Sequence, residues 1–473
     1  MGLIRPVPLL PAAELGDVHF IAIGGAGMSG IATAYADLGV RVSGSDQADS
    51  ATLRELQARG IDARVGHDPA NLGNATTVVV SSAVRETNVE LAEARRRGLR
   101  VWHRSAGLAA LMVGRTGIAV TGTHGKTTTS AMTAVLLAEC GADPSYVIGS
   151  PLTSSGTSSH LGGGEAFVVE ADESDGSFLQ YPARIVVVTN IEADHLDNWG
   201  TAEAYFAGFV ELTNAPGVEA VVLSADDPGA RVLIEPLRAA GKRVVTVGEA
   251  ADADVRLAAL SFSGSRASAW LQAADDQGPL DLAVPGRYNL LNAAAAYAVG
   301  TLLGIDGARL RQAAAAFDGT DRRFERVGEC GGVVVIDDYA HHPTEVVATL
   351  TAARVLAGSG RLVACFQPHL FTRTRDFAAQ FARALALADV IVVLGIYPAR
   401  EDPIPGVTGE LVSEALRGIA EPGTVHYVEA MVDAPRLLAA LVAPGDLVVT
   451  LGAGDVTRVG PALIGQLAER AGG

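Results

Sequence analysis

The sequence predicts an α/β protein built on parallel sheets that helices cover on both faces. Short apolar segments rich in Val and Ile recur along the chain, as in VHFIAIGG, ARIVVVTN and GDLVVTLGAGD, and each ends in glycine or polar residues. Ala- and Leu-rich segments with a helical pattern, such as TSAMTAVLLAECG, lie between several of them. Alternation of this kind is typical of parallel sheets, in which ligands bind beyond the carboxyl ends of the strands.

Three such units follow one another along the 473 residues. The first begins at Val18 and closes near LAALMVGR, the second runs to AAAAFDGTDRRFE, and the third starts at GGVVVIDDY. We therefore predict domains at residues 1–113, 114–321 and 322–473, with an antiparallel excursion between 252 and 285.

Composition excludes several classes of protein. A hydrophobic content of 49% with 19% charged residues is typical of a compact globular chain. The formal charge of −17 argues against nucleic acid or an anionic membrane as the main partner. No apolar run reaches the ~18 residues that span a bilayer, and prolines interrupt the N-terminal MGLIRPVPLLPAAELG, which makes it a poor signal peptide.

The cysteines indicate a reducing compartment. Cys140, Cys330 and Cys365 are widely spaced, odd in number and without a CxxC pair, which speaks against disulfides or a zinc site. We therefore expect a cytoplasmic protein.

A glycine-rich turn follows the first predicted strand. In IGGAGMSGIA the glycines have GxGxxG spacing, which lets a pyrophosphate approach a helix N-terminus. Asp46 stands near the position where a nicotinamide-dependent dehydrogenase places its ribose-binding acid, so a dehydrogenase remains one possible class. The candidate ligand-binding residues of this turn are Gly25, Ala26, Gly27, Met28, Ser29 and Gly30.

The segment VTGTHGKTTT looks like a phosphate-binding loop that is two residues short, because Val120 stands where the common P-loop has its first glycine. Lys126 supplies a mobile cation and Thr127 a hydroxyl that can ligate Mg²⁺. Lys126 is also one of only two lysines beside 34 arginines, which indicates that a compact ammonium is needed here. The predicted nucleoside triphosphate site comprises Gly122, Thr123, His124, Gly125, Lys126, Thr127 and Thr128.

Acidic residues crowd the ends of two later strands. VVEADESDGSF brings together Glu170, Asp172, Glu173 and Asp175, and TNIEADHLD brings together Asp194, His195 and Asp197. Carboxylates packed this closely repel one another unless a cation screens them, so the pattern predicts Mg²⁺.

Two further clusters suggest ligand contacts. PGRYNLLNAAAA places Asn289 and Asn292 on one helix face, where paired amides could bind an adenine edge or only cap the helix. IDDYAHHPTE and FQPHLFTRTR follow strands of the third unit and could form a basic pocket for an anionic substrate from His341, His342, His369, Arg373 and Arg375.

Taken together, the motifs resemble the Mur ligases. The resemblance spans residues 18–456 in the expected order and rests on IGGAGMSGIA, GTHGKTTT, VVEADESDGSFL, TNIEADHLD, GRYNLLNAAAA, DDYAHHPTE, QPHLFTRTRDF and GDLVVTLGAGD. It implies a Rossmann-like N-terminal domain for a UDP group, a central P-loop-type ATPase domain and a Rossmann-like C-terminal domain.

The same resemblance implies roles for individual residues. The GAGMSG turn would hold the UDP diphosphate, in place of a nicotinamide cofactor. Lys126, Glu173 and His195 would be catalytic, with Thr127, Glu173 and His195 as the metal ligands. Asn289 and Asn292 would contact the adenine of ATP, and His341 and Arg373 the muramate substrate. Two positions depart from the family: Tyr288 stands where it usually has His, and Leu370 where it usually has Arg.

The implied activity is an ATP- and Mg²⁺-dependent ligation of L-alanine to UDP-N-acetylmuramate through an acyl phosphate, during peptidoglycan synthesis. The nearest alternative is the murein-recycling branch, which joins a tripeptide to the same nucleotide sugar. A P-loop switch or motor is an alternative from another class, and predicts ATP turnover without the sugar. We expect small-molecule partners only, with neither nucleic acid nor membrane, and a monomer or weak homodimer.

Overall fold

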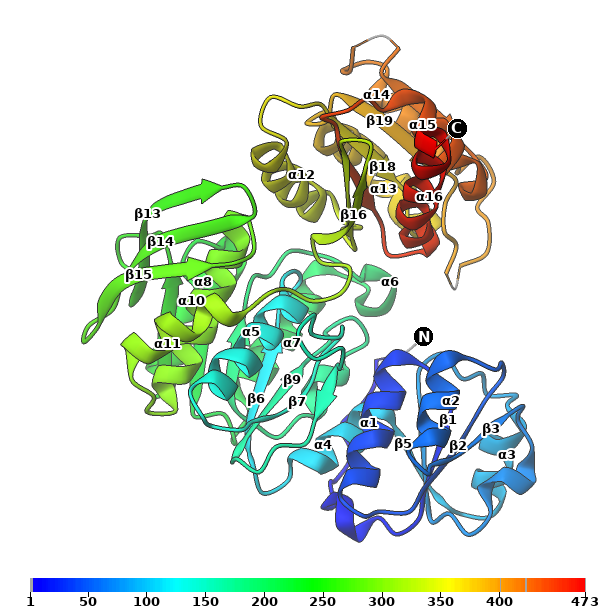
Figure 1. Ribbon diagram of the computed structural model, residues 1–473. Coiled ribbons are helices and arrows are strands. Elements are labelled where there is room, and N and C mark those ends of the chain that lie inside the picture. The colour runs from blue at the N-terminus through cyan, green and yellow to red at the C-terminus, as the bar shows by residue number, and fades with distance from the viewer. Residues whose placement is uncertain (1–2, 400, 422, 473) are drawn as a thin grey trace. The chain divides into compact units, whose positions relative to one another are not determined.

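A computed structural model describes residues 3–399, 401–421 and 423–472 and contains three sheets (Figure 1). The chain forms two compact units, one comprising Met1–Ala259, Ala269–Asp281 and Leu291–Phe317, the other Leu260–Ser268, Leu282–Leu290 and Asp318–Gly473. Each of the three sheets lies within one of the three predicted domains, and the first two sheets fall mostly in the first compact unit. The α/β prediction, with three domains on parallel sheets, is therefore confirmed, whereas the exact boundaries at 113 and 321 stay a prediction. No helix in the described ranges has both the length and the apolar character of a membrane span.

The first sheet has the strand order β3-β2-β1-β4-β5, and all of its neighbouring strands are parallel. Alternate residues face opposite sides of each strand: Phe20 and Val79 pack with α1, α2 and α4, while Ile21 and Val78 pack with α3. The elements are β1 (Val18–Ile21), α1 (Ala26–Asp37), β2 (Val42–Asp46), α2 (Ala51–Ala58), β3 (Asp62–Val65), β4 (Thr77–Val80), α3 (Val89–Arg96), β5 (Arg100–His103) and α4 (Arg104–Met112).

The second sheet has ten strands in the order β15-β14-β13-β12-β11-β10-β6-β9-β7-β8. Its centre is parallel: β6 (Thr116–Thr121) lies between β9 (Ala166–Glu170) and β10 (Ala183–Val188). The other strands are β7 (Ser145–Val147), β8 (Ser159–His160), β11 (Ala220–Ser224), β12 (Arg243–Gly248), β13 (Val255–Ser263), β14 (Arg266–Gln272) and β15 (Gln277–Leu282). Only Gly264 and Ser265 separate β13 from β14, a connection that permits only antiparallel pairing, as the sequence predicted for this segment.

Helices α5 to α11 belong to the same part of the chain. They are α5 (Lys126–Glu139), α6 (Leu196–Trp199), α7 (Ala202–Asn214), α8 (Pro228–Arg231), α9 (Ile234–Ala239), α10 (Arg287–Leu302) and α11 (Gly307–Ala313). Helix α5 follows the central strand β6 directly, so its N-terminus lies at the carboxyl edge of the sheet, where ligands of parallel sheets bind.

The third sheet has the order β16-β17-β21-β18-β19-β20 and is parallel except for the β16–β17 pair. Helices α12, α13 and α14 pack on one face, and α15 and α16 on the other. The elements are β16 (Glu325–Cys330), β17 (Val333–Asp338), α12 (Pro343–Ala357), β18 (Leu362–Phe366), α13 (Phe371–Leu385), β19 (Val390–Leu394), α14 (Glu410–Leu416), β20 (Val425–Val428), α15 (Ala434–Leu441), β21 (Leu447–Leu451) and α16 (Val459–Gly472).

A buried carboxylate connects distant segments of the first sheet. Glu90, on α3, is 0% exposed, and its oxygens accept hydrogen bonds from Ser45 Oγ at 2.5 Å and Asn71 Nδ2 at 2.7 Å. His19 Nε2 lies 3.3 Å away. Burial alone would raise the pKa of Glu90, but hydrogen bonds from His19, Ser45 and Asn71 lower it to about 2. The charged form of Glu90 therefore stabilises the folded state.

We expect Glu90→Gln to lower the free energy of unfolding by about 3 kcal/mol at pH 7. A carboxyl whose pKa falls from 4.5 to about 2 on folding stabilises the protein above pH 4.5 and loses that contribution as the pH drops toward 2. Urea unfolding of the wild-type and Glu90→Gln proteins should therefore give free energies of unfolding whose difference shrinks as the pH falls from 4.5 toward 2. Glu93→Gln is the control, because Glu93 lies on the same helix and pairs with arginines at the surface, where ion pairs contribute little. If the difference in the free energy of unfolding between wild type and Glu90→Gln stays constant down to pH 2, the lowered pKa of Glu90 is contradicted.

Candidate active site

The phosphate loop connects β6 to α5, and its glycines are required by its geometry. Gly122 has φ +126° and Gly125 φ +83°, a region that side-chain-bearing residues rarely adopt. A β-carbon at Gly122 would lie 2.1 Å from Thr189 Oγ1, and one at Gly125 would lie 3.0 Å from Asn292 Oδ1. Val120, where a longer loop would have its first glycine, is a buried residue of β6. The loop is therefore short because the strand continues to Thr121.

Lys126 is held beneath this loop by three oxygen atoms. Its ammonium donates to the carbonyl oxygens of Gly122 at 2.8 Å and Thr123 at 3.0 Å, and lies 2.8 Å from Glu173 Oε2. Burial acts to lower the pKa of Lys126, but the carboxylates of Glu173 and Asp172 outweigh it and raise the pKa. The side chain is therefore a permanently charged cation next to the loop.

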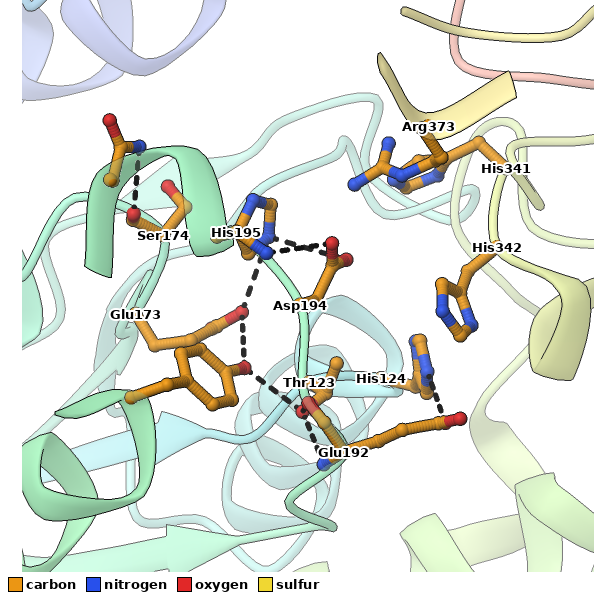
Figure 2. A network of polar contacts seen from close by, with 12 residues as sticks. Thr123, His124, Glu173, Ser174, Glu192, Asp194, His195, His341, His342 and Arg373 are labelled. Atoms are coloured by element: carbon orange, nitrogen blue, oxygen red, sulfur yellow. Dashed lines mark hydrogen bonds and ion pairs between the residues drawn. The ribbon is translucent and has the colours of Figure 1, made fainter. Parts of the chain in front are cut away.

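Glu173 is the most enclosed member of the acidic cluster, with 0% exposure. Its Oε1 lies 3.6 Å from His195 Nε2 (Figure 2). The hydroxyl of Tyr205 lies 3.4 Å from the same oxygen. Burial raises the pKa of Glu173, an effect that Lys126 opposes. The structure thus brings together Lys126, Glu173 and His195, the residues predicted to be catalytic.

A second carboxylate, that of Glu170, lies beside the hydroxyl predicted to ligate a metal. Glu170 ends β9 in register with Val120 of β6, and its Oε1 accepts a hydrogen bond from Thr127 Oγ1 at 3.0 Å. Its other oxygen accepts from the backbone N–H of Gly149 at 2.7 Å. Sequence reasoning placed Glu170 in the acidic cluster but did not assign it as a ligand. The pairing of β9 with β6 brings Glu170 to the end of the sheet where the loop begins, within hydrogen-bond distance of Thr127.

The donor set suits Mg²⁺. Thr127 offers a hydroxyl oxygen, and Glu170 and Glu173 offer carboxylate oxygens, which are the ligands that this cation prefers. Asp172 is also ionised: burial would raise its pKa, but Lys126 and Arg104 lower it to about 2. His195, next to Glu173, could serve as a further ligand at the edge of the cluster.

The remaining loop residues hold the backbone in place. The N–H of His124 donates to Asn190 Oδ1 at 2.9 Å, and His124 Nε2 lies 3.1 Å from Glu192 (Figure 2). Thr123 Oγ1 donates to the carbonyl oxygen of Glu192 at 2.9 Å, and Thr128 is buried in the first turn of α5. These contacts fix the loop to the segment that follows β10.

The two predicted adenine-site asparagines lie one turn apart on α10, and both are buried. Asn289 Nδ2 donates to the carbonyl oxygen of Pro285 at 2.7 Å, whereas its buried Oδ1 has no hydrogen-bond partner among the described residues. A buried acceptor without a partner is costly, and the exocyclic amine of adenine could supply the missing donor. Tyr288, the departure from the family pattern, is a neutral phenol because burial raises its pKa.

The glycine turn between β1 and α1 is fixed by Asp46. Its Oδ2 accepts a hydrogen bond from the backbone N–H of Gly24 at 2.9 Å, so the acid considered for a dinucleotide ribose is engaged with the turn itself. A β-carbon at Gly27 would lie 3.1 Å from Arg104 Nη1, which places a guanidinium over the turn. Helix α1 begins at Ala26, Met28 is buried, Ser29 is half-buried, and Gly25 and Gly30 complete the spacing.

In the second unit, aromatic and basic side chains gather beyond β17 and β18. Arg373, in the first turn of α13, is 6% exposed and donates to His369 Nδ1 at 3.4 Å. The ring of His369 lies 5.7 Å from that of His341 and stacks on Tyr397 at 5.9 Å. Leu370 has φ +69°, an outlying value for a bulky residue. Of the five residues predicted to form a basic pocket, His341, His369 and Arg373 lie together. Arg375 is instead exposed and pairs with Asp376, and His342 is the buried N-cap residue of α12. Substrate binding by this cluster stays a prediction.

Family models match nearly the whole chain. "Mur ligase family, catalytic domain" matches residues 17–116, "Mur ligase middle domain" matches 120–300, and "Mur ligase, glutamate ligase domain" matches 322–454. The chain is 63% identical over 473 residues to the UDP-N-acetylmuramate–L-alanine ligase of Cutibacterium acnes, with 100% of both chains covered. The protein of the same name from Kineococcus radiotolerans is 55% identical over 463 residues, which cover 97% of this chain and 98% of that one.

Solved structures agree with these matches. The UDP-N-acetylmuramate–alanine ligase of Thermotoga maritima superposes with a TM-score of 0.81 at 28% identity, covering 96% of this chain and 99% of that one. A murein peptide ligase from Psychrobacter arcticus gives 0.69 at 25% identity, covering 96% and 98%. The chain belongs to the Mur ligase family, and the resemblance of its motifs is confirmed.

We expect Lys126→Arg to reduce ATP-dependent turnover below about a tenth of the wild-type value, a barrier increase above ~1.4 kcal/mol. A planar guanidinium is too broad for the position between two loop carbonyls and Glu173. Lys242→Arg is the matched control, because the only other lysine donates to the carbonyl oxygens of Ala215 and Val218 away from the loop. Steady-state kinetics of both variants test this, and a Lys126→Arg enzyme with more than a tenth of normal turnover would contradict it.

Proposed function

We propose that this protein is an ATP-dependent ligase that joins L-alanine to the lactyl carboxylate of UDP-N-acetylmuramate. The observation that carries the proposal is the 63% identity, over the full length of both chains, to a ligase of that name. The phosphate loop supports it, because Lys126 and the N-terminus of α5 provide the positive charge that a triphosphate needs. The reaction belongs to the synthesis of peptidoglycan precursors.

The chemistry has two steps. The lactyl carboxylate attacks the γ-phosphorus of ATP, the bond to the β-phosphate oxygen breaks, and ADP leaves an acyl phosphate behind. The amine of L-alanine then attacks the acyl carbon, loses a proton and expels inorganic phosphate. The first step is an in-line phosphoryl transfer, in which positioning and neutralisation of charge provide most of the catalysis.

Different residues of the site would neutralise the phosphates, hold Mg²⁺ and bind the adenine. Lys126 would neutralise the phosphate oxygens from beneath the loop, and the backbone N–H groups of α5 would hold the remaining charge. Mg²⁺ held by Thr127, Glu173 and His195, with Glu170 beside Thr127, would supply further neutralisation of the phosphates. The adenine would lie against Asn289 and Asn292.

We assign the other substrate groups as follows. The turn from Gly25 to Gly30 would hold the UDP diphosphate, because α1 begins there and the guanidinium of Arg104 lies over it. His341 and Arg373 would contact the muramate portion. We keep a monomer or weak homodimer, and the cytoplasm, as predictions. The three cysteines are free thiols in the structure.

The decisive experiment measures phosphate release with ATP, UDP-N-acetylmuramate and one amine donor at a time. We expect release with L-alanine and none with the tripeptide L-Ala-γ-D-Glu-meso-diaminopimelate. Release only with the tripeptide would favour the recycling branch instead. ATP hydrolysis that is independent of the nucleotide sugar would favour a switch or motor, and nicotinamide binding without ATP turnover would favour a dehydrogenase.

We expect Arg373→Ala to raise the KM for UDP-N-acetylmuramate roughly 10- to 100-fold and to leave the KM for ATP nearly unchanged. Leu370 provides no charge where the family usually has Arg, so Arg373 and His341 must neutralise more of the substrate. Arg375→Ala is the control, because Arg375 is exposed on the same helix and pairs with Asp376. An equal loss of ATP affinity would place Arg373 in the nucleotide site instead.

A further inference from the structure

We propose that Tyr205 is a positioning residue, whose hydroxyl connects the phosphate loop to Glu173 and sets the affinity of that carboxylate for a divalent cation. The inference rests on the proposed function, in which Glu173 is a metal ligand. No sequence motif contains Tyr205, which lies in α7 within the apolar segment AYFAGFVEL. Its role emerges only from the fold.

The ring of Tyr205 is fixed by aromatic packing. Tyr205 is 1% exposed, and its ring meets those of Trp199 and Phe209 edge-on at centroid distances of 5.9 Å and 5.2 Å. Trp199 also donates from Nε1 to the backbone carbonyl oxygen of Glu173 at 2.9 Å. One aromatic residue therefore holds the backbone of Glu173 and its neighbour holds the side chain.

The hydroxyl of Tyr205 has two partners. It lies 3.0 Å from Thr123 Oγ1, in the phosphate loop, and 3.4 Å from Glu173 Oε1. Thr123 Oγ1 in turn contacts the backbone of Glu192, donating to its carbonyl oxygen and accepting from its N–H, both at 2.9 Å. A continuous chain of donor–acceptor contacts thus runs from the segment after β10, through the loop, to the buried carboxylate, and two hydroxyl hydrogens are shared among three of these contacts.

The two hydroxyl hydrogens of Thr123 and Tyr205 can be placed in two ways. Each hydroxyl carries one hydrogen. Tyr205 can donate to Glu173 while Thr123 donates to Tyr205, or Tyr205 can donate to Thr123 while Thr123 donates to the carbonyl oxygen of Glu192. In the second arrangement Glu173 Oε1 is released, and no buried hydroxyl loses its partner. A cation can therefore take this oxygen without leaving an unsatisfied group behind.

The hydrogen bond from Tyr205 to Glu173 also limits how far the carboxylate can turn toward Lys126. The ammonium lies 2.8 Å from Oε2 of Glu173, while Tyr205 and His195 face Oε1. Without the phenol oxygen, the carboxylate could turn so that Lys126 takes both of its oxygens. Tyr205 therefore orients the carboxylate before the cation binds, and loss of a side chain that orients a metal ligand typically costs 10- to 100-fold in metal affinity.

Tyr205→Phe tests the proposal, because it keeps the ring packing and removes only the oxygen. We would titrate MgCl₂ into the full-length protein saturated with ADP and measure the dissociation constant by calorimetry. We expect it to rise about tenfold. The matched control is Tyr35→Phe: Tyr35 is also fully buried, and its hydroxyl donates to the carbonyl oxygen of Gly107 at 2.7 Å in the first sheet's domain. This control should lose a comparable buried hydrogen bond and keep the wild-type affinity for Mg²⁺.

A double-mutant cycle with Glu173→Gln shows whether Tyr205 acts through Glu173. In the Glu173→Gln background, we expect Tyr205→Phe to change the Mg²⁺ dissociation constant less than twofold. The proposal is overturned if Tyr205→Phe alone leaves that constant within twofold of wild type, if the effect is equally large without Glu173, or if Tyr35→Phe reproduces it. Failure of the proposed function looks different: the wild-type protein would bind Mg²⁺ with ADP but release no phosphate with UDP-N-acetylmuramate and L-alanine.

Discussion

Lys126 and Glu173 form an ion pair whose carboxylate is entirely shielded from water. Removing one partner of such a pair typically costs about 3–5 kcal/mol, because the remaining charge is left buried without compensation. The surroundings are built to satisfy both charges: loop carbonyls accept from the ammonium, while Tyr205 and His195 face the carboxylate. The loop, the acidic segment and α7 are therefore held in one arrangement by electrostatics as much as by packing.

The phosphate loop was predictable because its strand, its glycines, its lysine and its helix are consecutive in the sequence. The acidic segment was predictable as a cluster but not in detail. Four carboxylates lie within six residues, and only the pairing of β9 with β6 shows that Glu170 faces Thr127. Glu173 lies beyond the strand end, where the alternation of faces no longer applies, and the turn directs it inward to Lys126.

Interactions between distant segments escaped prediction for the same reason. Tyr205 belongs to an apolar helix face, and its hydroxyl contacts Thr123 only because α7 packs near the loop. Glu90 belongs to no motif of the sequence, and its partners His19, Ser45 and Asn71 come from three other segments. The alternation of strands and helices was sufficient for the α/β class, because hydrophobic periodicity is a local property. Strand order and buried polar partners are set by tertiary packing.

Two neighbouring acids, Asp172 and Glu173, pair with cations from two different helices, Arg104 of α4 and Lys126 of α5. Asp172 lies 3.5 Å from Arg104, whose guanidinium also covers the glycine turn at Gly27, and the adjacent Glu173 neutralises Lys126. On the proposed function, a diphosphate at the glycine turn would compete with Asp172 for Arg104, and a triphosphate at the loop would compete with Glu173 for Lys126. Each competition would free a carboxylate beside the proposed Mg²⁺ site and thereby increase the negative charge available to the cation. The binding of both phosphate-bearing substrates and the affinity for Mg²⁺ would then be linked through two neighbouring residues, and by thermodynamic reciprocity Mg²⁺ would strengthen the binding of both substrates.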